Sequence, residues 1–169
     1  EVISSLLSIP MAHQLVGFYT IADGGDGVLK VMRSYQFNAA QQITSVVRSH
    51  DWKRKNQRGG YIWHTTGSGK TMTSFKSAQL IADSGDADKV FFIMDRIELG
   101  VQSLNEYRNF AGGALTEQQR KKTVRGTEDT RELRKALTDK NYDGKLIVTS
   151  IQKMDNLCAK KFLTEYESE

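Results

Sequence analysis

Apolar residues recur at helical spacing in several stretches of the chain. Over residues 35–50 the side chains of Phe37, Ala40, Ile43 and Val47 follow one another three or four positions apart, which is the pattern of one buried helix face. This spacing predicts a helix there. We expect further helices over residues 70–83, 97–109 and 128–138, one that begins near residue 151, and short helical turns over residues 4–16 that break near Pro10.

Short unbroken apolar runs predict strands. Residues 89–94 and 145–150 are continuous runs of this kind, typical of strands buried on both faces. We expect a similar run, residues 60–64, to be the first strand of the core sheet. The apolar runs 17–22 and 28–32 flank an Asp/Gly-rich stretch, which predicts a hairpin. We interpret residues 111–126, rich in Gly, Gln and basic residues, as a loop or an irregular helix.

Strands that alternate with helices predict one architecture. Parallel strands need crossover connections, and helices supply them. The fold class is therefore α/β: a three-layer fold with a central parallel sheet.

The turn between residues 64 and 71 carries the clearest candidate chemistry. It reads Thr65-Thr66-Gly67-Ser68-Gly69-Lys70-Thr71 between a predicted strand and a predicted helix, which is the context of a phosphate-binding P-loop. Glycines let consecutive N–H groups turn toward phosphate oxygens, and the helix N-terminus adds positive potential. Lys70 is the candidate for the β- and γ-phosphates, and the Thr71 hydroxyl for Mg²⁺. His64 stands where the broadest form of the motif has glycine.

A glutamine upstream of the P-loop is the candidate base reader. The Gln36 amide offers one donor and one acceptor, which match the two-point edge of adenine. Arg33 and Tyr35 lie close by in sequence, and an arginine or an aromatic ring can pack on a base. The alternative is an ordinary helix N-terminus. The order of glutamine, helix, strand and P-loop favours nucleotide binding.

Polar residues follow two of the predicted strands. Asp95 and Arg96 come after the second, and Thr149, Ser150 and Lys153 after the third. Ligands of open parallel sheets bind beyond the carboxyl ends of the strands, so Arg96 is placed to contact a polyanion. Thr149, Ser150 and Lys153 suit contacts to a phosphate backbone. A structural ion pair of Arg96 and helix capping by Ser150 remain open as alternatives.

Composition and charge set wider bounds. At 169 residues the chain has room for one domain, or one domain with a flanking arm. It lacks a long apolar run, and its single cysteine leads us to expect a reducing, cytoplasmic setting. The net charge of +4 permits an anionic partner. Basic residues gather in two clusters, which are either solvated loops or phosphate contacts: Lys53, Arg54, Lys55 and Arg58, then Arg120, Lys121, Lys122 and Arg125.

These motifs, in this order, resemble the restriction (R) subunit of type I restriction-modification enzymes. The resemblance covers about residues 30–155, and its specific part is Trp63-His64 before the P-loop. It implies a superfamily 2 motor with RecA-like domains, which uses ATP and Mg²⁺ to translocate double-stranded DNA and belongs to an ATP-dependent endonuclease. It also implies methyltransferase (modification) and specificity subunits as partners.

The resemblance also assigns roles along the chain. Gln36 falls in the adenine-reading motif, Gly67–Thr71 in motif I, Asp95 and Arg96 in motif Ia, and Thr149–Lys153 in the next DNA-backbone motif. Gly100 departs from the family's acidic residue after the motif Ia leucine. We expect residues 1–33 to be a connecting arm from a preceding, nuclease-type domain, and residues 34–169 to be the first part of motor domain 1.

The chain has no Asp-Glu-Ala-His-like Walker B segment and no nuclease motif. We therefore expect this piece alone to be inactive in hydrolysis, and the chain to start inside a longer protein, because it has no initiator methionine. Three alternatives stay open: another superfamily 2 helicase or DNA-dependent ATPase, a small-molecule P-loop kinase, and a non-catalytic nucleotide sensor.

Overall fold

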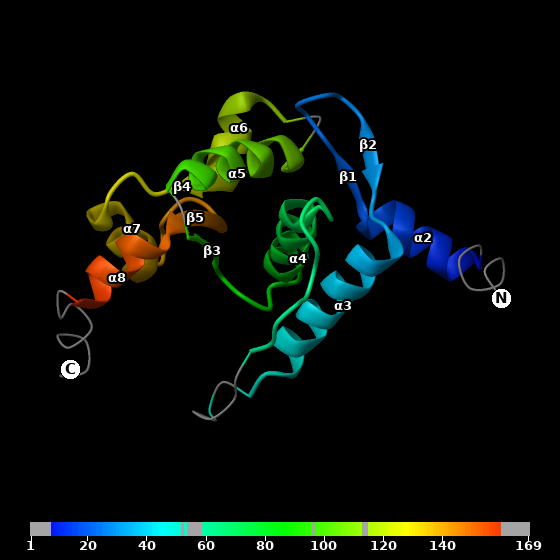
Figure 1. Ribbon diagram of the computed structural model, residues 1–169, viewed down its shortest axis with the longest axis horizontal. Coiled ribbons are helices and arrows are strands. Elements are labelled where there is room, and N and C mark those ends of the chain that lie inside the picture. The colour runs from blue at the N-terminus through cyan, green and yellow to red at the C-terminus, as the bar shows by residue number, and fades with distance from the viewer. Residues whose placement is uncertain (1–7, 52, 54–58, 96, 113–114, 160–169) are drawn as a thin grey trace.

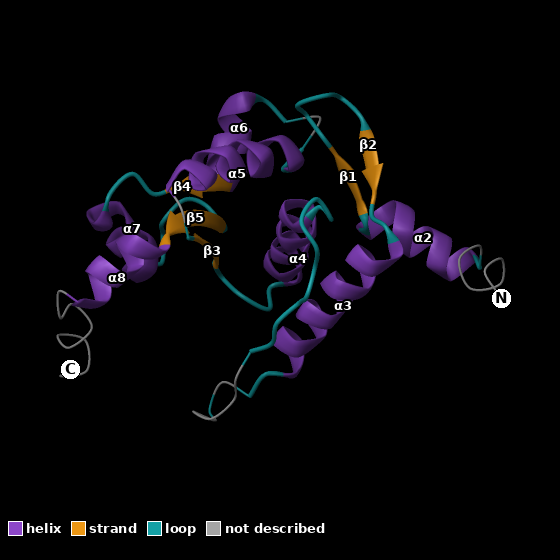
Figure 2. Ribbon diagram, viewed as in Figure 1, coloured by secondary structure: helices purple, strands orange, loops and turns teal. Residues whose placement is uncertain are grey.

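The computed structural model describes residues 8–51, 53, 59–95, 97–112 and 115–159. Twelve helices and strands are assigned within these residues (Figures 1 and 2). In chain order they are α2 (Ile9–Phe18), β1 (Thr20–Ala22), β2 (Leu29–Val31), α3 (Ser34–Ser49), α4 (Lys70–Ser84), β3 (Val90–Met94), α5 (Ile97–Phe110), α6 (Glu117–Thr123), β4 (Val124–Gly126), α7 (Thr130–Thr138), β5 (Leu146–Ser150) and α8 (Ile151–Ala159).

Three parallel strands form the central sheet, in the order β3-β5-β4. Val90 pairs with Leu146 on one side of β5, and Val124 pairs with the same residue on the other. All five residues of β5 are buried, as its central place requires. The prediction of an α/β fold with a parallel sheet is confirmed.

Helices cover both faces of this sheet. Side chains of α4 and α5 pack with alternate residues of β5, and the shared core contains Phe75, Tyr107, Leu146 and Val148. On the other side α8 contacts β5 and α7 packs against α8 (Figure 1). Because side chains alternate across a strand, Ile147 and Thr149 face this second layer. The three-layer arrangement follows from these two helix pairs.

The N-terminal hairpin shares the same core. Strands β1 and β2 pair antiparallel, as predicted, and Ile21 of β1 is only 2% exposed among the side chains of α4 and α5. The Lys76 ammonium of α4 donates to the Thr20 carbonyl at 3.1 Å and to Gln79 Oε1 at 3.0 Å. Burial lowers the pKa of this lysine. The boundary proposed at residue 33 therefore separates two segments that share one core.

The structure differs from the prediction at residues 60–64 and within residues 111–126. The sequence predicts a strand at residues 60–64, but these residues form an extended loop with Tyr61 89% and Trp63 87% exposed. Within the described residues, β3 pairs only with β5, so this apolar run has no strand beside it and no face to bury. The sequence predicts no strand in residues 111–126, yet β4 forms at Val124–Gly126 because Val124 is fully buried beside β5.

Pro10 lies in the first turn of α2 and does not break the helix. A proline is tolerated there because its missing N–H would have no intrahelical partner. Residues 4–7 of the predicted helical turns lie outside the described residues.

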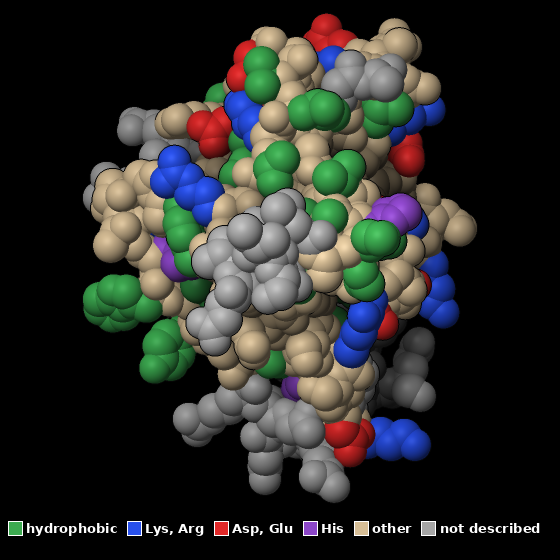
Figure 3. All heavy atoms as spheres, turned by 90° about the vertical axis from the view of Figure 1, so that its right-hand side faces the viewer, with side chains coloured by type: hydrophobic (Ala, Val, Ile, Leu, Met, Phe, Trp, Pro, Cys, Tyr) green, Lys and Arg blue, Asp and Glu red, His purple; other side chains and the backbone are tan. Residues whose placement is uncertain are grey.

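Several apolar side chains of α2 and β2 are exposed on the face shown in Figure 3, among them Ile9, Val16, Phe18, Leu29 and Val31.

Candidate nucleotide-binding site

The P-loop sequence forms a tight turn at the N-terminus of α4. Gly67 and Gly69 both have a φ of 75°, in the left-handed region that glycine occupies without strain. The Ser68 hydroxyl donates to the Thr65 carbonyl at 2.7 Å and closes the turn. Gly69 is the N-cap of α4, and no side chain caps the helix there. The first-turn N–H groups, at the positive end of the helix, therefore remain available for an anion.

Lys70 is folded over the loop that it follows. Its ammonium lies 3.2 Å from the Thr65 carbonyl oxygen and 3.5 Å from that of His64. The side chain is exposed, so it can exchange these neutral acceptors for phosphate oxygens. Thr71 is the next residue of the first helical turn. The loop, Lys70 and Thr71 together have the donor set that a nucleoside triphosphate with Mg²⁺ requires.

Gln36 meets the P-loop from the first turn of α3. Its side chain is 2% exposed. The amide Nε2 donates to the Ser68 carbonyl at 3.0 Å, and Oε1 accepts from the Arg33 backbone N–H at 2.9 Å. The predicted proximity of Gln36 to the loop is therefore present, but both ends of the amide are engaged within the protein. Each end keeps one further hydrogen-bonding position, because the amide nitrogen has two hydrogens and the oxygen two lone pairs.

Sequence reasoning missed the part played by Tyr35. Its hydroxyl donates to the same Ser68 carbonyl at 2.9 Å. The ring stands edge-on to that of His64, with 5.3 Å between ring centroids and 90° between planes. An aromatic residue beside Gln36 was the only sequence signal, and it carries no information on a partner 33 residues away.

A shallow cavity of about 470 Å³ opens beside the P-loop. Its lining combines the loop with three rings and one guanidinium: Arg33, Tyr35, Trp63, His64, Thr65, Thr66, Gly67 and Ser68. Flat apolar faces next to a cation suit a purine base. Trp63 is part of this lining because residues 60–64 do not enter the sheet.

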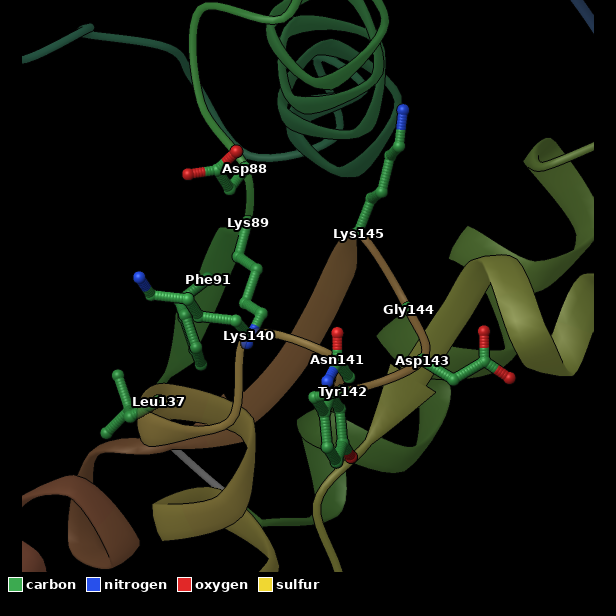
Figure 4. A pocket seen from close by; sticks show the side chains of 10 residues that line it. All are labelled: Asp88, Lys89, Phe91, Leu137, Lys140, Asn141, Tyr142, Asp143, Gly144 and Lys145. Carbon is green, nitrogen blue, oxygen red and sulfur yellow. The ribbon is translucent and has the colours of Figure 1, made fainter.

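A second cavity, of about 830 Å³, lies at the amino ends of β3 and β5 (Figure 4). Two of its three lysines, Lys89 and Lys145, are used by the fold. Lys89 donates to the Ala136 and Asp139 carbonyls at the end of α7, and Lys145 donates to the Ala82 carbonyl near the end of α4. These ammonium groups stabilise the negative ends of two helices. The cavity is thus at the opposite end of α4 from the P-loop and offers no phosphate cradle.

Comparison with known proteins agrees with this geometry. The family model described as SWI2/SNF2 ATPase matches residues 35–168. The chain belongs to the SWI2/SNF2 ATPase family. The match begins at Tyr35, so the family's region includes the Tyr35–Gln36 turn, the P-loop and the whole parallel sheet.

Relatives of this SWI2/SNF2 ATPase chain are subunits of restriction enzymes. It is 38% identical over 133 residues to the C-terminal part of the putative type I restriction enzyme MpnIIP endonuclease subunit of Mycoplasma pneumoniae, covering 76% of this chain and 60% of that protein. It is 37% identical over 141 residues to the type I restriction enzyme SsaAORF53P endonuclease subunit of Staphylococcus saprophyticus and to the SauCOLORF180P subunit of Staphylococcus aureus. Each of these two matches covers 83% of this chain and 13% of the relative. The resemblance to R subunits is confirmed, and the chain spans only part of each of these relatives.

Three of the residues predicted to contact DNA, Thr149, Ser150 and Lys153, make hydrogen bonds within the protein. Thr149 and Ser150 are buried, with 4% and 5% exposed. The Thr127 hydroxyl donates to Thr149 Oγ1 at 2.8 Å, and Ser150 Oγ accepts from the Lys153 N–H at 3.4 Å. The Lys153 ammonium donates to the Thr127 carbonyl. Here these residues serve the fold, while Arg96 lies outside the described residues.

Three of the four residues of the second basic cluster are also engaged within the molecule. Arg120 donates to the Leu115 and Gly24 carbonyls at 3.1 and 3.3 Å. Lys121 pairs with Glu117 at 2.7 Å, and Arg125 with Asp143 at 3.2 Å. Of the first cluster, Lys53 is exposed, and Arg54, Lys55 and Arg58 lie outside the described residues.

Among the residues that the structure does describe, no helix combines the length and apolar character needed to cross a membrane.

Proposed function

We propose that this chain is the ATP-binding part of the restriction subunit of a type I restriction-modification enzyme, in which ATP hydrolysis drives translocation along duplex DNA before cleavage. The observation that carries the proposal is the P-loop itself, with left-handed Gly67 and Gly69 leading into the uncapped first turn of α4. The relatives named as type I restriction enzyme endonuclease subunits support the wider assignment.

The residues divide the work on the nucleotide as follows. Backbone N–H groups from Thr66 to Thr71 hold the phosphates, and Lys70 leaves the Thr65 carbonyl to neutralise the β- and γ-oxygens. The Thr71 hydroxyl would hold Mg²⁺. When bound, ATP with Mg²⁺ supplies the phosphoryl group whose hydrolysis is coupled to movement. Arg33, which lines the cavity together with Trp63, and Gln36 are the proposed contacts to the base.

The proposal extends to partners. Arg96, Thr149, Ser150 and Lys153 are the proposed contacts to double-stranded DNA. Thr149 and Ser150 end β5, and Lys153 lies in the first turn of α8. Methyltransferase and specificity subunits complete the proposed complex. For Thr149, Ser150 and Lys153 to reach DNA, the bonds with Thr127 and within the first turn of α8 must open.

The test is ATP hydrolysis by the full-length protein, with and without long duplex DNA, in the wild type and in Lys70→Ala. We expect DNA to stimulate hydrolysis. Lys70→Ala should lower the stimulated rate roughly a hundred-fold or more, because the positive charge that stabilises the phosphates in the transition state is lost. Lys140→Ala is the matched control, since Lys140 is an exposed lysine that lines the cavity at the other end of the sheet. Its rate should equal that of the wild type.

Two results would count against the motor. Hydrolysis that depends on Lys70 but ignores DNA would favour a small-molecule P-loop kinase. Nucleotide binding with no turnover in the full-length protein would favour a non-catalytic sensor. Equal loss in Lys70→Ala and Lys140→Ala would point to unfolding of both variants, and thermal melting curves would show it.

A further inference from the structure

We infer that Tyr35 is a positioning residue for the phosphate-binding loop, acting through the carbonyl of Ser68. This inference rests on the proposed function, because it concerns the same site. The Ser68 carbonyl accepts two hydrogen bonds from α3, one from the Tyr35 hydroxyl at 2.9 Å and one from Gln36 Nε2 at 3.0 Å. A carbonyl oxygen has two lone pairs, so this acceptor is fully used.

Anchoring this carbonyl orients an N–H group of the loop. Ser68 C=O and Gly69 N–H belong to one planar trans peptide and point in opposite directions. With the carbonyl held against α3, the Gly69 N–H is directed away from the two donors on α3. That N–H is one of the group that would cradle phosphate.

Within the loop, the Ser68 N–H and hydroxyl both donate to the Thr65 carbonyl, so the Ser68 carbonyl depends on α3 for its anchor. Ser68 stands between Gly67 and Gly69, both in left-handed conformation. Glycines on either side make rotation of the intervening peptide inexpensive, since no Cβ opposes it. Two donors fixed on a helix select one orientation before any phosphate binds, which lowers the ordering cost of binding.

Both donors are themselves held in place. The Gln36 amide is fixed by the Arg33 N–H, which donates to Oε1 and leaves Nε2 facing the loop. The Tyr35 ring is held edge-on by the His64 ring. Tyr35 is the cleaner residue to test, because Gln36 has a proposed part in reading the base.

The experiment measures dissociation constants of mant-ATP and mant-GTP for the full-length protein and its Tyr35→Phe variant. Loss of one hydrogen bond that orients the cradle should weaken both nucleotides by the same factor, roughly three- to ten-fold. The ratio of the two constants should not change, because the effect acts on phosphate and not on the base. The thermal midpoint should stay at the wild-type value, since Tyr35 is 36% exposed.

Tyr61→Phe is the matched control, because Tyr61 lies near the loop and is 89% exposed. It should bind both nucleotides as the wild type does. The inference is overturned if Tyr35→Phe binds both nucleotides normally, or if it weakens mant-ATP alone, which would make Tyr35 a base-reading residue. If the wild type and Tyr61→Phe also bind neither nucleotide, the proposed function itself fails, and the role of Tyr35 with it.

Discussion

Tyr107 brings a phenol hydroxyl into the centre of the molecule. The residue is 1% exposed, its ring packs against those of Phe75 and Phe92, and its hydroxyl donates to Ser74 Oγ at 2.7 Å. Burial raises the pKa of this phenol above its usual value, because the phenolate would lose its hydration. Below the pKa of the unfolded chain the neutral phenol is present in both states and adds no pH dependence.

At alkaline pH this residue should destabilise the fold. Above about pH 10 the unfolded chain releases a proton that the folded chain retains, so the free energy of unfolding falls by up to about 1.4 kcal/mol per pH unit from this group. In Tyr107→Phe we expect a loss of about 1 kcal/mol at pH 8, from the missing hydrogen bond, but a shallower decline between pH 10 and 11. Urea unfolding of both proteins at pH 8, 10 and 11 measures this, with Tyr61→Phe as the exposed control. Parallel pH profiles for wild type and Tyr107→Phe would contradict the prediction.

Helix α7 shows how the ends of an element are set by its side chains. The Asp129 carboxylate accepts from the Glu132 N–H at 2.8 Å and caps the helix, while Glu132 Oε2 accepts from the Glu128 N–H at 2.7 Å. Leu133 and Ala136 are fully buried on its inner face. The cap and the apolar pair together explain why this segment was predictable from sequence.

Removing the cap should cost a defined amount of stability. We expect Asp129→Ala to lower the free energy of unfolding by about 1 kcal/mol, because the first turn of α7 loses its acceptor. Asp155→Ala, at an exposed position in α8, is the control and should change it far less. Urea denaturation with both variants side by side decides the matter. Equal effects would mean that Asp129 does not act as a cap.

Helices and strands were predictable where their own sequence determines them. They were not predictable where pairing with a distant segment determines them. Helices α3 and α4 follow from their own apolar spacing and from glycine at the ends of α4. The run at residues 60–64 is as apolar as a strand, but pairing depends on a partner that local sequence cannot specify. The sequence around Val124 does not have the pattern of a strand, yet residues 124–126 pair with β5. In the site, the P-loop was predictable as a continuous motif, whereas the contact of Tyr35 with Ser68 joins segments far apart in sequence.

The strands of the central sheet differ in how far they are buried and paired. The central strand, β5, is covered on both faces and paired on both sides. Within the described residues β3 has one paired side only, and Ile93 on it is 45% exposed. An edge strand with apolar side chains is a template for pairing with another chain.

A charge on that strand should oppose self-association. We expect Ile93→Lys to lower the association constant of the chain roughly two- to five-fold, since like charges on paired strands repel. Val101→Lys, at an exposed position of α5, adds the same charge away from the sheet edge and is the control. Sedimentation velocity over a concentration series measures both. The edge would be excluded as the contact if the two variants associate alike.

Gly69 and Gln36 constrain one another's evolution. A Cβ at position 69 would lie 2.5 Å from Gln36 Nε2, and the φ of 75° already disfavours other residues there. A change at position 69 would thus displace the amide that orients the loop, and a bulkier residue at position 36 would collide with the turn. Among descendants of a common ancestor, these two sites should have been free to vary only together.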